Sequence, residues 1–303
     1  FAFAIANIAI SIVTLLVSHT FLNMQVQSRK VALWLLATFP WVASIIIALY
    51  FLNGYISPNY FDSGIEYAHW HHMNEFSWLS WHGMSLMAAM VFGLKIVIGK
   101  IMQLIRHQRD LAVLLALSGK IDDGIYEINV PEPSAFTAGF INKKCLVSSG
   151  LLAAMSDEEL AVIMAHERAH AASNDPFKKW LFSTFTAFFI PPLAARLKLQ
   201  MTLAMEQSAD SAVANDAVSS TFVASTLVKV ARLQAEHSPM TDNDLIVNFG
   251  ADVLEQRIYF LLGKLNLKPM NKSVAAIFSV LVIAVCLSSI DGLHHLIETV
   301  FGH

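Results

Sequence analysis

The distribution of apolar residues is the feature that most constrains what this chain can fold into. Apolar stretches at about 1–22, 31–52, 83–105 and 273–290 are each close to the ~20 residues that a helix needs to cross a bilayer. Charged residues make up only 14% of the chain, whereas a soluble domain averages about 25%. The sequence therefore predicts a mainly α-helical membrane protein with four transmembrane helices.

The positions of the basic residues predict how these helices are oriented. None of the 20 lysines and arginines lies at 53–82 or at 291–303. Because basic residues are retained on the cytoplasmic side, these two segments should face outward and the body, 106–272, should be cytoplasmic. The predicted organisation is three spans with an outward loop in 1–105, a cytoplasmic domain in 106–272, and a fourth span with a short outward tail in 273–303. The predicted location is the cytoplasmic (inner) membrane, which makes the lipid bilayer a partner.

Composition excludes some classes of function. The net charge of −3 is too small to indicate direct binding of nucleic acid. Cys145 and Cys286 are far apart and form no C-x-x-C pair, so neither a disulfide scaffold nor a cysteine-based metal site is indicated. Seven of the 12 histidines fall in the outward segments, where they could bind a metal, sense pH, or simply occupy the membrane interface: His69, His71, His72, His82, His294, His295 and His303.

The body has the texture of an α+β domain. Residues 124–150 predict two or three short strands, and Ser156 with Glu159 predicts the capping box of a helix that runs to about Ala172. The apolar segment 180–195 is too short to span a bilayer. It could form a hairpin or a tilted helix that dips into the cytoplasmic leaflet, or it could form a buried core helix. Further helices are expected at about 196–215 and across 219–265, with an interruption at 237–244.

The stretch "MAHERAHAASNDP" (164–176) carries the chemistry, because it contains an H-E-x-x-H sequence. Residues four apart share one face of a helix, so His166 and His170 can offer two nitrogens to one metal ion. Glu167 lies beside them, where it can take a proton from a metal-bound water. This pattern predicts a zinc-dependent hydrolytic site, although the five residues alone are a weak signal.

Acidic residues further along the chain strengthen this prediction. Catalytic zinc has three protein ligands and one open position. Glu206, 36 residues after His170 on the next long helix, is the candidate third ligand. Asp210 follows Glu206 by one turn, and Asp175 follows the first helix. Either carboxylate could orient a ligating histidine from outside the ligand shell, although Asp210 could also be a surface carboxylate and Asp175 a helix terminator.

The residues around the H-E-x-x-H sequence resemble those of a known family. The block "LVSSGLLAAMSDEELAVIMAHERAHAASNDP" (146–176), followed by a hydrophobic segment and "EQSADSAV" (206–213), is similar to the BlaR/MecR-type membrane zinc metallopeptidases. The resemblance implies a gluzincin-like site with His166, His170 and Glu206 as Zn²⁺ ligands and Glu167 as the base. It also implies a site close to the cytoplasmic face of the bilayer, and cleavage of a protein substrate such as a cytoplasmic repressor or the chain itself.

The edge strand near 134–141 resembles the strand against which such peptidases align the substrate backbone. Ala135, Phe136, Thr137 and Ala138 are the candidate substrate-strand residues, and an ordinary hairpin is the alternative.

The chain also departs from that family. Only 13 residues follow Ile290, too few for the penicillin-binding sensor domain of the β-lactam receptors, so antibiotic sensing is not expected to carry over. An HtpX-like or CAAX-type processing or quality-control membrane protease, which shares H-E-x-x-H with a later E-x-x-x-D, is the main alternative. A receptor with a structural zinc closed by four protein ligands is a non-enzymatic alternative.

Overall fold

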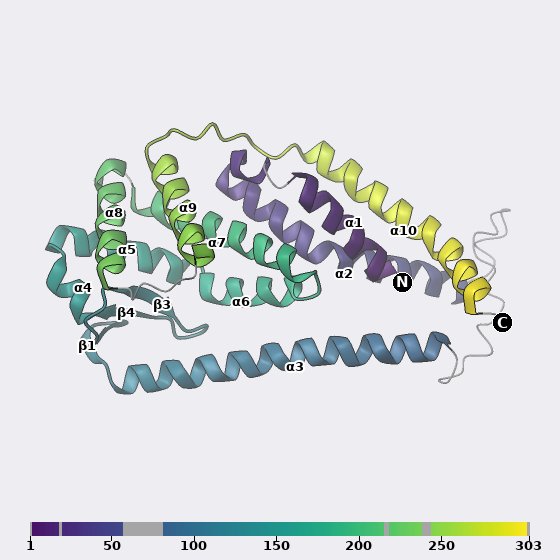
Figure 1. Cartoon of the computed structure of the whole chain (residues 1–303), viewed down its shortest axis with the longest axis horizontal. Helices are drawn as coiled ribbons and strands as arrows, with labels where there is room; N and C mark the ends of the chain where they lie inside the picture. The colour runs from purple at the N-terminus through teal and green to yellow at the C-terminus, as the bar shows by residue number, and fades with distance from the viewer. Residues whose placement is uncertain (1, 18–19, 57–80, 215–217, 238–243, 302–303) are drawn as a thin grey trace.

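The computed structural model describes residues 2–17, 20–56, 81–214, 218–237 and 244–301 (Figure 1). Most of the segment 53–82, which was predicted to face outward, lies outside these residues, as do His69, His71, His72 and His303. The side chains of His82, His294 and His295 are not described either. The elements of the first half are α1 (Ala2–Val17), the 3-10 helix η1 (Thr20–Asn23), α2 (Val26–Ile56), α3 (Trp81–Ala116), β1 (Gly119–Asp122), β2 (Ile125–Ile128), β3 (Ala135–Ala138) and β4 (Lys144–Ser148). Those of the second half are α4 (Ser149–Ala154), α5 (Asp157–Ala172), α6 (Asp175–Thr186), α7 (Pro191–Val213), α8 (Ser220–His237), α9 (Asp244–Leu261) and α10 (Lys272–Phe301).

The four short strands form one mixed sheet in the order β1-β2-β4-β3. β2 runs parallel to β4, and the other two pairs are antiparallel. The prediction of two or three short strands in 124–150 is confirmed, because β2, β3 and β4 lie there, and β1 is an additional strand. Its residues are all exposed, so the apolar pattern that marks a buried strand is absent there. β3 lies at an edge, as the sequence predicted.

The sheet is covered on both faces, and alternation along the strands decides which residue faces which cover. Cys145 and Val147 of β4 pack with Ile163 of α5 in one cluster. Leu146, between them, packs on the opposite face with Leu111, which lies near the end of α3. The C-terminal part of α3 therefore packs against the sheet, and α3 runs eleven residues beyond the expected end of that span at 105.

Within the part of the chain that the structure describes, two helices are long and apolar enough to cross a membrane, at Val26–Tyr50 in α2 and Gly83–Ala116 in α3. α1 and α10 contain shorter apolar stretches, Ala2–Leu15 and Lys272–Leu287. The prediction of four transmembrane helices is therefore supported for two of them and not confirmed for the other two.

The segment 180–195 does not form one helix. It contains the end of α6, a short turn, and the start of α7, because α6 ends at Thr186 and α7 begins at Pro191. A proline is well tolerated in the first turn of a helix, where its missing N–H has no intrahelical partner. Phe182 and Phe189 are only 1% and 5% exposed, and they pack with residues of α1 and α2 such as Ile10 and Leu33. The segment is therefore part of a helical hairpin, as one alternative predicted, and it also buries aromatic side chains in protein, as the other predicted. Ile190 at the turn is 56% exposed.

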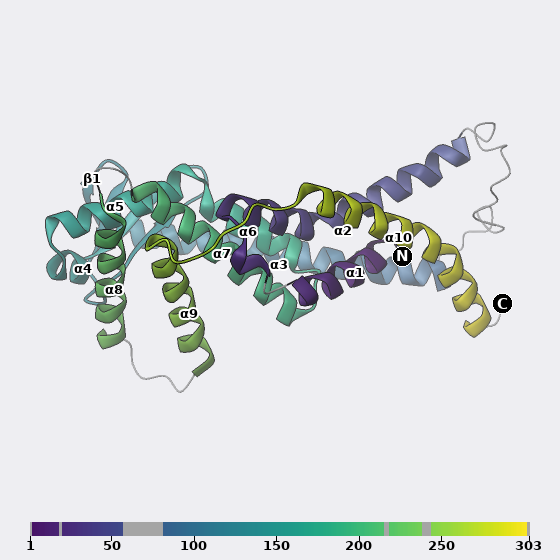
Figure 2. The same ribbon diagram turned by 90° about the horizontal axis from the view of Figure 1, so that it is seen from above.

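One polar link lies inside this largely apolar contact. The fully buried Arg29, near the start of α2, donates from Nη2 to Gln207 Oε1 of α7 at 2.6 Å. Gln207 in turn donates from Nε2 to the carbonyl oxygen of Gln256 on α9 at 3.1 Å. α2, α7 and α9 are therefore connected directly behind the face of α7 that carries Glu206. Figure 2 shows α8 and α9 lying side by side and projecting from the body together.

Candidate metal centre

α5 carries the H-E-x-x-H sequence and is well defined at both ends. The Ser156 hydroxyl accepts from the Glu159 N–H, and the Glu159 side chain accepts from the Ser156 N–H, so the predicted capping box is confirmed. The helix ends before Asn174, whose φ of 56° is a left-handed conformation that asparagine tolerates. This turn redirects the chain so that Asp175 starts α6 back towards α5.

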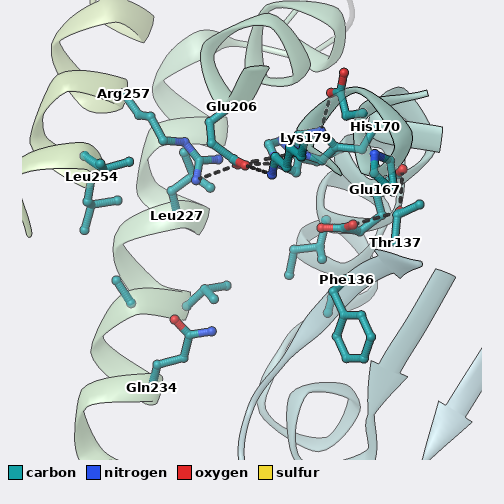
Figure 3. Close-up of a pocket in the computed structure, with 18 of the residues that line it drawn as sticks. Phe136, Thr137, Glu167, His170, Lys179, Glu206, Leu227, Gln234, Leu254 and Arg257 are labelled. Carbon is teal, nitrogen blue, oxygen red and sulfur yellow. Dashed lines mark hydrogen bonds and ion pairs between the residues drawn. The ribbon is translucent and has the colours of Figure 1, made fainter. Parts of the chain in front are cut away.

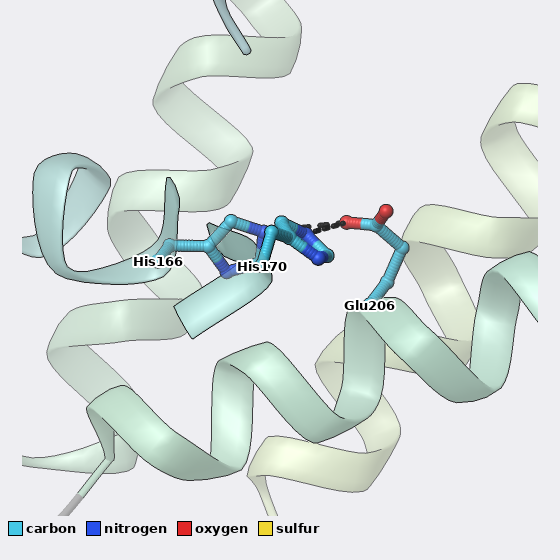
Figure 4. Close-up of side chains that lie close together, drawn as sticks. All are labelled: His166, His170 and Glu206. Atoms are coloured by element: carbon cyan, nitrogen blue, oxygen red, sulfur yellow. Dashed lines mark hydrogen bonds and ion pairs between the residues drawn. The ribbon is translucent and has the colours of Figure 1, made fainter. Parts of the chain in front are cut away.

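The predicted ligands come together at one point. His166 Nε2 lies 3.1 Å from His170 Nε2 and 3.3 Å from Glu206 Oε2, and His170 Nε2 lies 3.5 Å from the same oxygen (Figure 4). α5 supplies the two imidazoles, and α7, which packs across it, supplies the carboxylate. Three ligand-type atoms from two helices therefore form a nearly regular triangle.

The dimensions of this triangle fit zinc. Ligands about 2.0–2.1 Å from a tetrahedral zinc ion are about 3.3 Å apart, and the three measured separations are 3.1, 3.3 and 3.5 Å. Two neutral imidazoles and one carboxylate are also a donor set that zinc prefers. His166, His170 and Glu206 are the residues that could hold the metal.

The second nitrogen of each histidine faces a carboxylate. His170 Nδ1 lies 2.7 Å from Asp175 Oδ2, and His166 Nδ1 lies 3.0 Å from Asp210 Oδ1. The hydrogen bond to Asp175 fixes the orientation of the His170 ring. Asp210 is close enough to His166 Nδ1 for a charge contact, although that nitrogen has no hydrogen-bond partner among the described residues. The structure thus places both aspartates beside the candidate ligand histidines.

Arg257 on α9 completes the polar cluster, and the sequence did not reveal it. Its Nε and Nη2 donate to the two carboxylate oxygens of Asp210 at 2.8 and 2.7 Å, and its Nη1 lies 3.3 Å from Glu206 Oε2. Lys179 of α6 lies 3.3 Å from Glu206 Oε1 and was missed as well. Helical spacing links Glu206 to Asp210, but no local pattern indicates that an arginine 47 residues beyond Asp210 returns to it.

The electrostatics of the cluster favour a bound cation. Burial opposes ionisation of Glu206, but its contacts with His166 and His170 hold the pKa of this carboxyl well below its usual range. Burial likewise opposes charge on His170, yet its hydrogen bonds to Asp175 and Glu206 raise the pKa of the imidazole to about 9. Both shifts have the same cause, since ionised carboxylates surround the imidazoles and stabilise positive charge at their nitrogens.

Glu167 lies beside the ligands and is held by the edge strand. The Thr137 hydroxyl lies 2.9 Å from Glu167 Oε2 and 2.8 Å from the Glu167 carbonyl oxygen. Thr137 was predicted only as part of a substrate-aligning strand, so its contact with the candidate base is new. Glu167 itself is buried, with 8% of its surface exposed.

The free edge of β3 faces this site. The Ser148 N–H donates to the Ser134 carbonyl oxygen at 2.9 Å, so the alternate residues Phe136 and Ala138 bond to β4. The backbone groups of Ala135 and Thr137 consequently point away from β4, towards the open edge. Among the described strands, β4 is the one neighbour of β3, so β3 offers, next to Glu167, N–H and C=O groups that no other described strand uses.

A cavity of about 1010 Å³ contains the cluster and the free edge. Figure 3 shows Leu227 and Gln234 of α8 on one side and Phe136 and Thr137 of β3 on the other, with Glu206, Arg257 and His170 at one end. The cavity also reaches α3, where Gln103, Leu104 and His107 line it. A polypeptide segment could therefore lie between β3 and α8 and pass the candidate metal centre.

Two histidines and a nearby glutamate on one helix, completed by a glutamate from the next long helix, define the class of site found in zinc-type metallopeptidases. Comparison with known families agrees, because residues 100–241 match Peptidase family M48. The chain therefore contains an M48-type metallopeptidase domain. Peptidases of this family are typically zinc-dependent, and the family includes membrane proteases. The match does not confirm the BlaR/MecR type that the sequence resembles.

Proposed function

We propose that this chain is a membrane-bound zinc endopeptidase that hydrolyses peptide bonds near the cytoplasmic face of the membrane. The observation that carries the proposal is the triangle formed by His166 Nε2, His170 Nε2 and Glu206 Oε2, with Glu167 beside it. The zinc fit of this triangle and the M48-type domain support the proposal. The distribution of lysine and arginine supports the cytoplasmic orientation.

Each residue of the site has a separate role in the proposed reaction. When bound, zinc lowers the pKa of a coordinated water to about 7 and polarises the substrate carbonyl. The Glu167 carboxylate accepts a proton from the attacking water and delivers it to the nitrogen of the leaving amine. Thr137 orients that carboxylate through its hydroxyl. The open backbone groups of Ala135 and Thr137 align the substrate by adding it as a strand to β3.

The biological role that we propose is regulatory, with a cytoplasmic repressor or the chain itself as substrate. This role rests on the sequence resemblance to BlaR/MecR-type peptidases. A processing or quality-control role of the HtpX or CAAX type is the second candidate. One observation favours it, since the cavity reaches Gln103, Leu104 and His107 on α3, a helix apolar enough to span the membrane. A membrane-anchored substrate would reach the site along that helix.

The test is a comparison of the wild type with Glu167→Gln. Removing the base should lower peptide hydrolysis by about 10²–10⁴-fold, while metal analysis of the purified protein should still give bound zinc. Retained hydrolysis in Glu167→Gln would contradict the assigned mechanism. Quantifying new protein termini in cells that carry either version would then separate the two roles, because a regulator predicts one or a few lost cleavages and quality control predicts many.

A further inference from the structure

The wall of the cavity opposite β3 has a composition that the proposed reaction does not explain. On α8, its apolar members follow helical spacing and form one stripe: Val223, Leu227, Val230, Ala231 and Ala235. α9 adds Val253 and Leu254, the latter one turn before Arg257. Figure 3 shows Leu227 and Leu254 close to Arg257 and Glu206, so this apolar wall adjoins the candidate metal centre.

The charges near this wall are already paired. Arg257 is engaged by Asp210 and Glu206, and Lys179 by Glu206. Lys229 of α8 does not line the cavity, because its Nζ donates to Glu159 Oε2 at 2.6 Å on another side of the helix. Among the described residues that line the α8 side of the cavity, none carries a charge that is left for a substrate side chain.

The far end of the wall is closed by a side chain. Gln234 of α8 donates from Nε2 to the Pro133 carbonyl oxygen at 3.2 Å and so bridges α8 to the segment before β3. Gln234 is seven residues after Leu227, a rise of about 10 Å along the helix. That length accommodates about three residues of an extended peptide, so the apolar wall serves only positions close to the reacting bond.

We propose that Leu227 and Leu254 determine specificity by selecting a large apolar side chain next to the bond that is cleaved. This inference rests on the proposed peptidase function and names its substrate class. An aliphatic or aromatic side chain that enters from β3 would bury its surface against the α8–α9 wall. A charged side chain would lose its water without gaining a partner, which disfavours it.

The experiment uses the full-length protein in detergent micelles and a mixture of peptides with randomised sequences, with products identified by mass spectrometry. The wild type should prefer Leu, Met or Phe over Asp or Lys by at least about tenfold at one position beside the cleaved bond, since a single missing methylene already changes selectivity by about tenfold or more. Leu227→Arg should shift that position towards Asp and Glu. Leu227→Ala enlarges the pocket with less disturbance and should shift it towards Phe and Trp.

Val228→Arg is the matched control, because Val228 is 36% exposed on the same helix and does not line the cavity. It should keep the wild-type preference. Cleavage by the wild type without an apolar preference, or an unchanged preference in both Leu227 variants, would overturn the inference and leave the peptidase function standing. A wild type that cleaves no peptide in the mixture would overturn both.

Discussion

The two histidines of the candidate centre are supported in different ways. His170 is oriented by Asp175, five residues later, across a single turn of chain. His166 faces Asp210 of α7, and Asp210 is held by Arg257 of α9, so this support spans three helices. One half of the centre is therefore local, and the other depends on the packing of distant elements. Any change in the packing of α9 should affect His166 first.

Among the residues around the candidate metal centre, the largest effect on zinc binding is expected at Glu206, because both halves of the centre share it. Glu206→Gln keeps the size of the side chain but removes the charge next to both Nε2 atoms. We expect zinc binding and peptide hydrolysis to fall by more than the ~10–100-fold that follows from losing an outer partner of a ligand. Zinc content after dialysis and the hydrolysis rate measure this, and a variant that still holds stoichiometric zinc would contradict the assignment of Glu206 as a ligand.

Asp210→Asn should come next, near the upper end of the ~10–100-fold range for zinc affinity. It removes the negative charge 3.0 Å from His166 Nδ1 and also leaves the largely buried Arg257 without its bidentate carboxylate acceptor. Competition with a zinc chelator gives the affinity, and thermal unfolding gives the accompanying loss of stability.

A double-mutant cycle on zinc affinity, measured by competition with a chelator, can isolate the coupling between the metal centre and α9. Arg257→Met should be strongly non-additive with Asp210→Asn and nearly additive with Asp175→Asn, because Asp210 is the one of the two aspartates that contacts the arginine. Equal coupling to both aspartates would show that the two halves are not separate.

Asp175→Asn should have a smaller effect, near tenfold on zinc affinity. Asparagine at this position can still accept a hydrogen bond from His170 Nδ1–H, and no buried cation is left unpaired. Chelator competition under the conditions used for Asp210→Asn measures it. A larger loss for Asp175→Asn than for Asp210→Asn would reverse the comparison.

The smallest effect is expected at the start of α5, away from both halves. A hydrogen bond from Lys229 and another from the Ser156 N–H lower the pKa of Glu159. A lowered carboxyl pKa contributes stability above its unfolded value of about 4.3, and this is lost as the pH falls through the folded value. Lys229→Met should therefore cost below about 1 kcal/mol at pH 7, and this difference should vanish in acid. Urea unfolding at pH 7 and in acid measures the difference in unfolding free energy between the variant and the wild type. The zinc content should not change.

The same contrast between local and distant contacts explains what the sequence could predict. The capping box, the two histidines on one face and the turn at Asn174 are set by neighbours within a few residues, and all are found in the structure. Glu206 and Asp210 could be predicted because helical spacing links them to each other. Arg257 could not, since its partner is fixed by how α9 packs against α7. β1 was missed because none of its side chains is buried.

Long-range packing also explains why hydropathy alone did not predict how the apolar helices pack against the rest of the protein. Hydropathy identifies α2 and α3 equally well. It does not indicate that α2 packs against α6 and α7, whereas most apolar side chains along α3 are exposed.

The buried link from Arg29 through Gln207 to the Gln256 carbonyl has a practical consequence for the boundaries of this enzyme unit. The segment that matches the peptidase family ends at residue 241 and begins at residue 100. Excised on its own, it would leave Gln207 without its donor from α2, Asp210 without Arg257, and Phe182 and Leu193 without the α2 surface that covers them. A protein fragment designed to fold on its own should therefore extend beyond residues 100–241 and include α2 and α9.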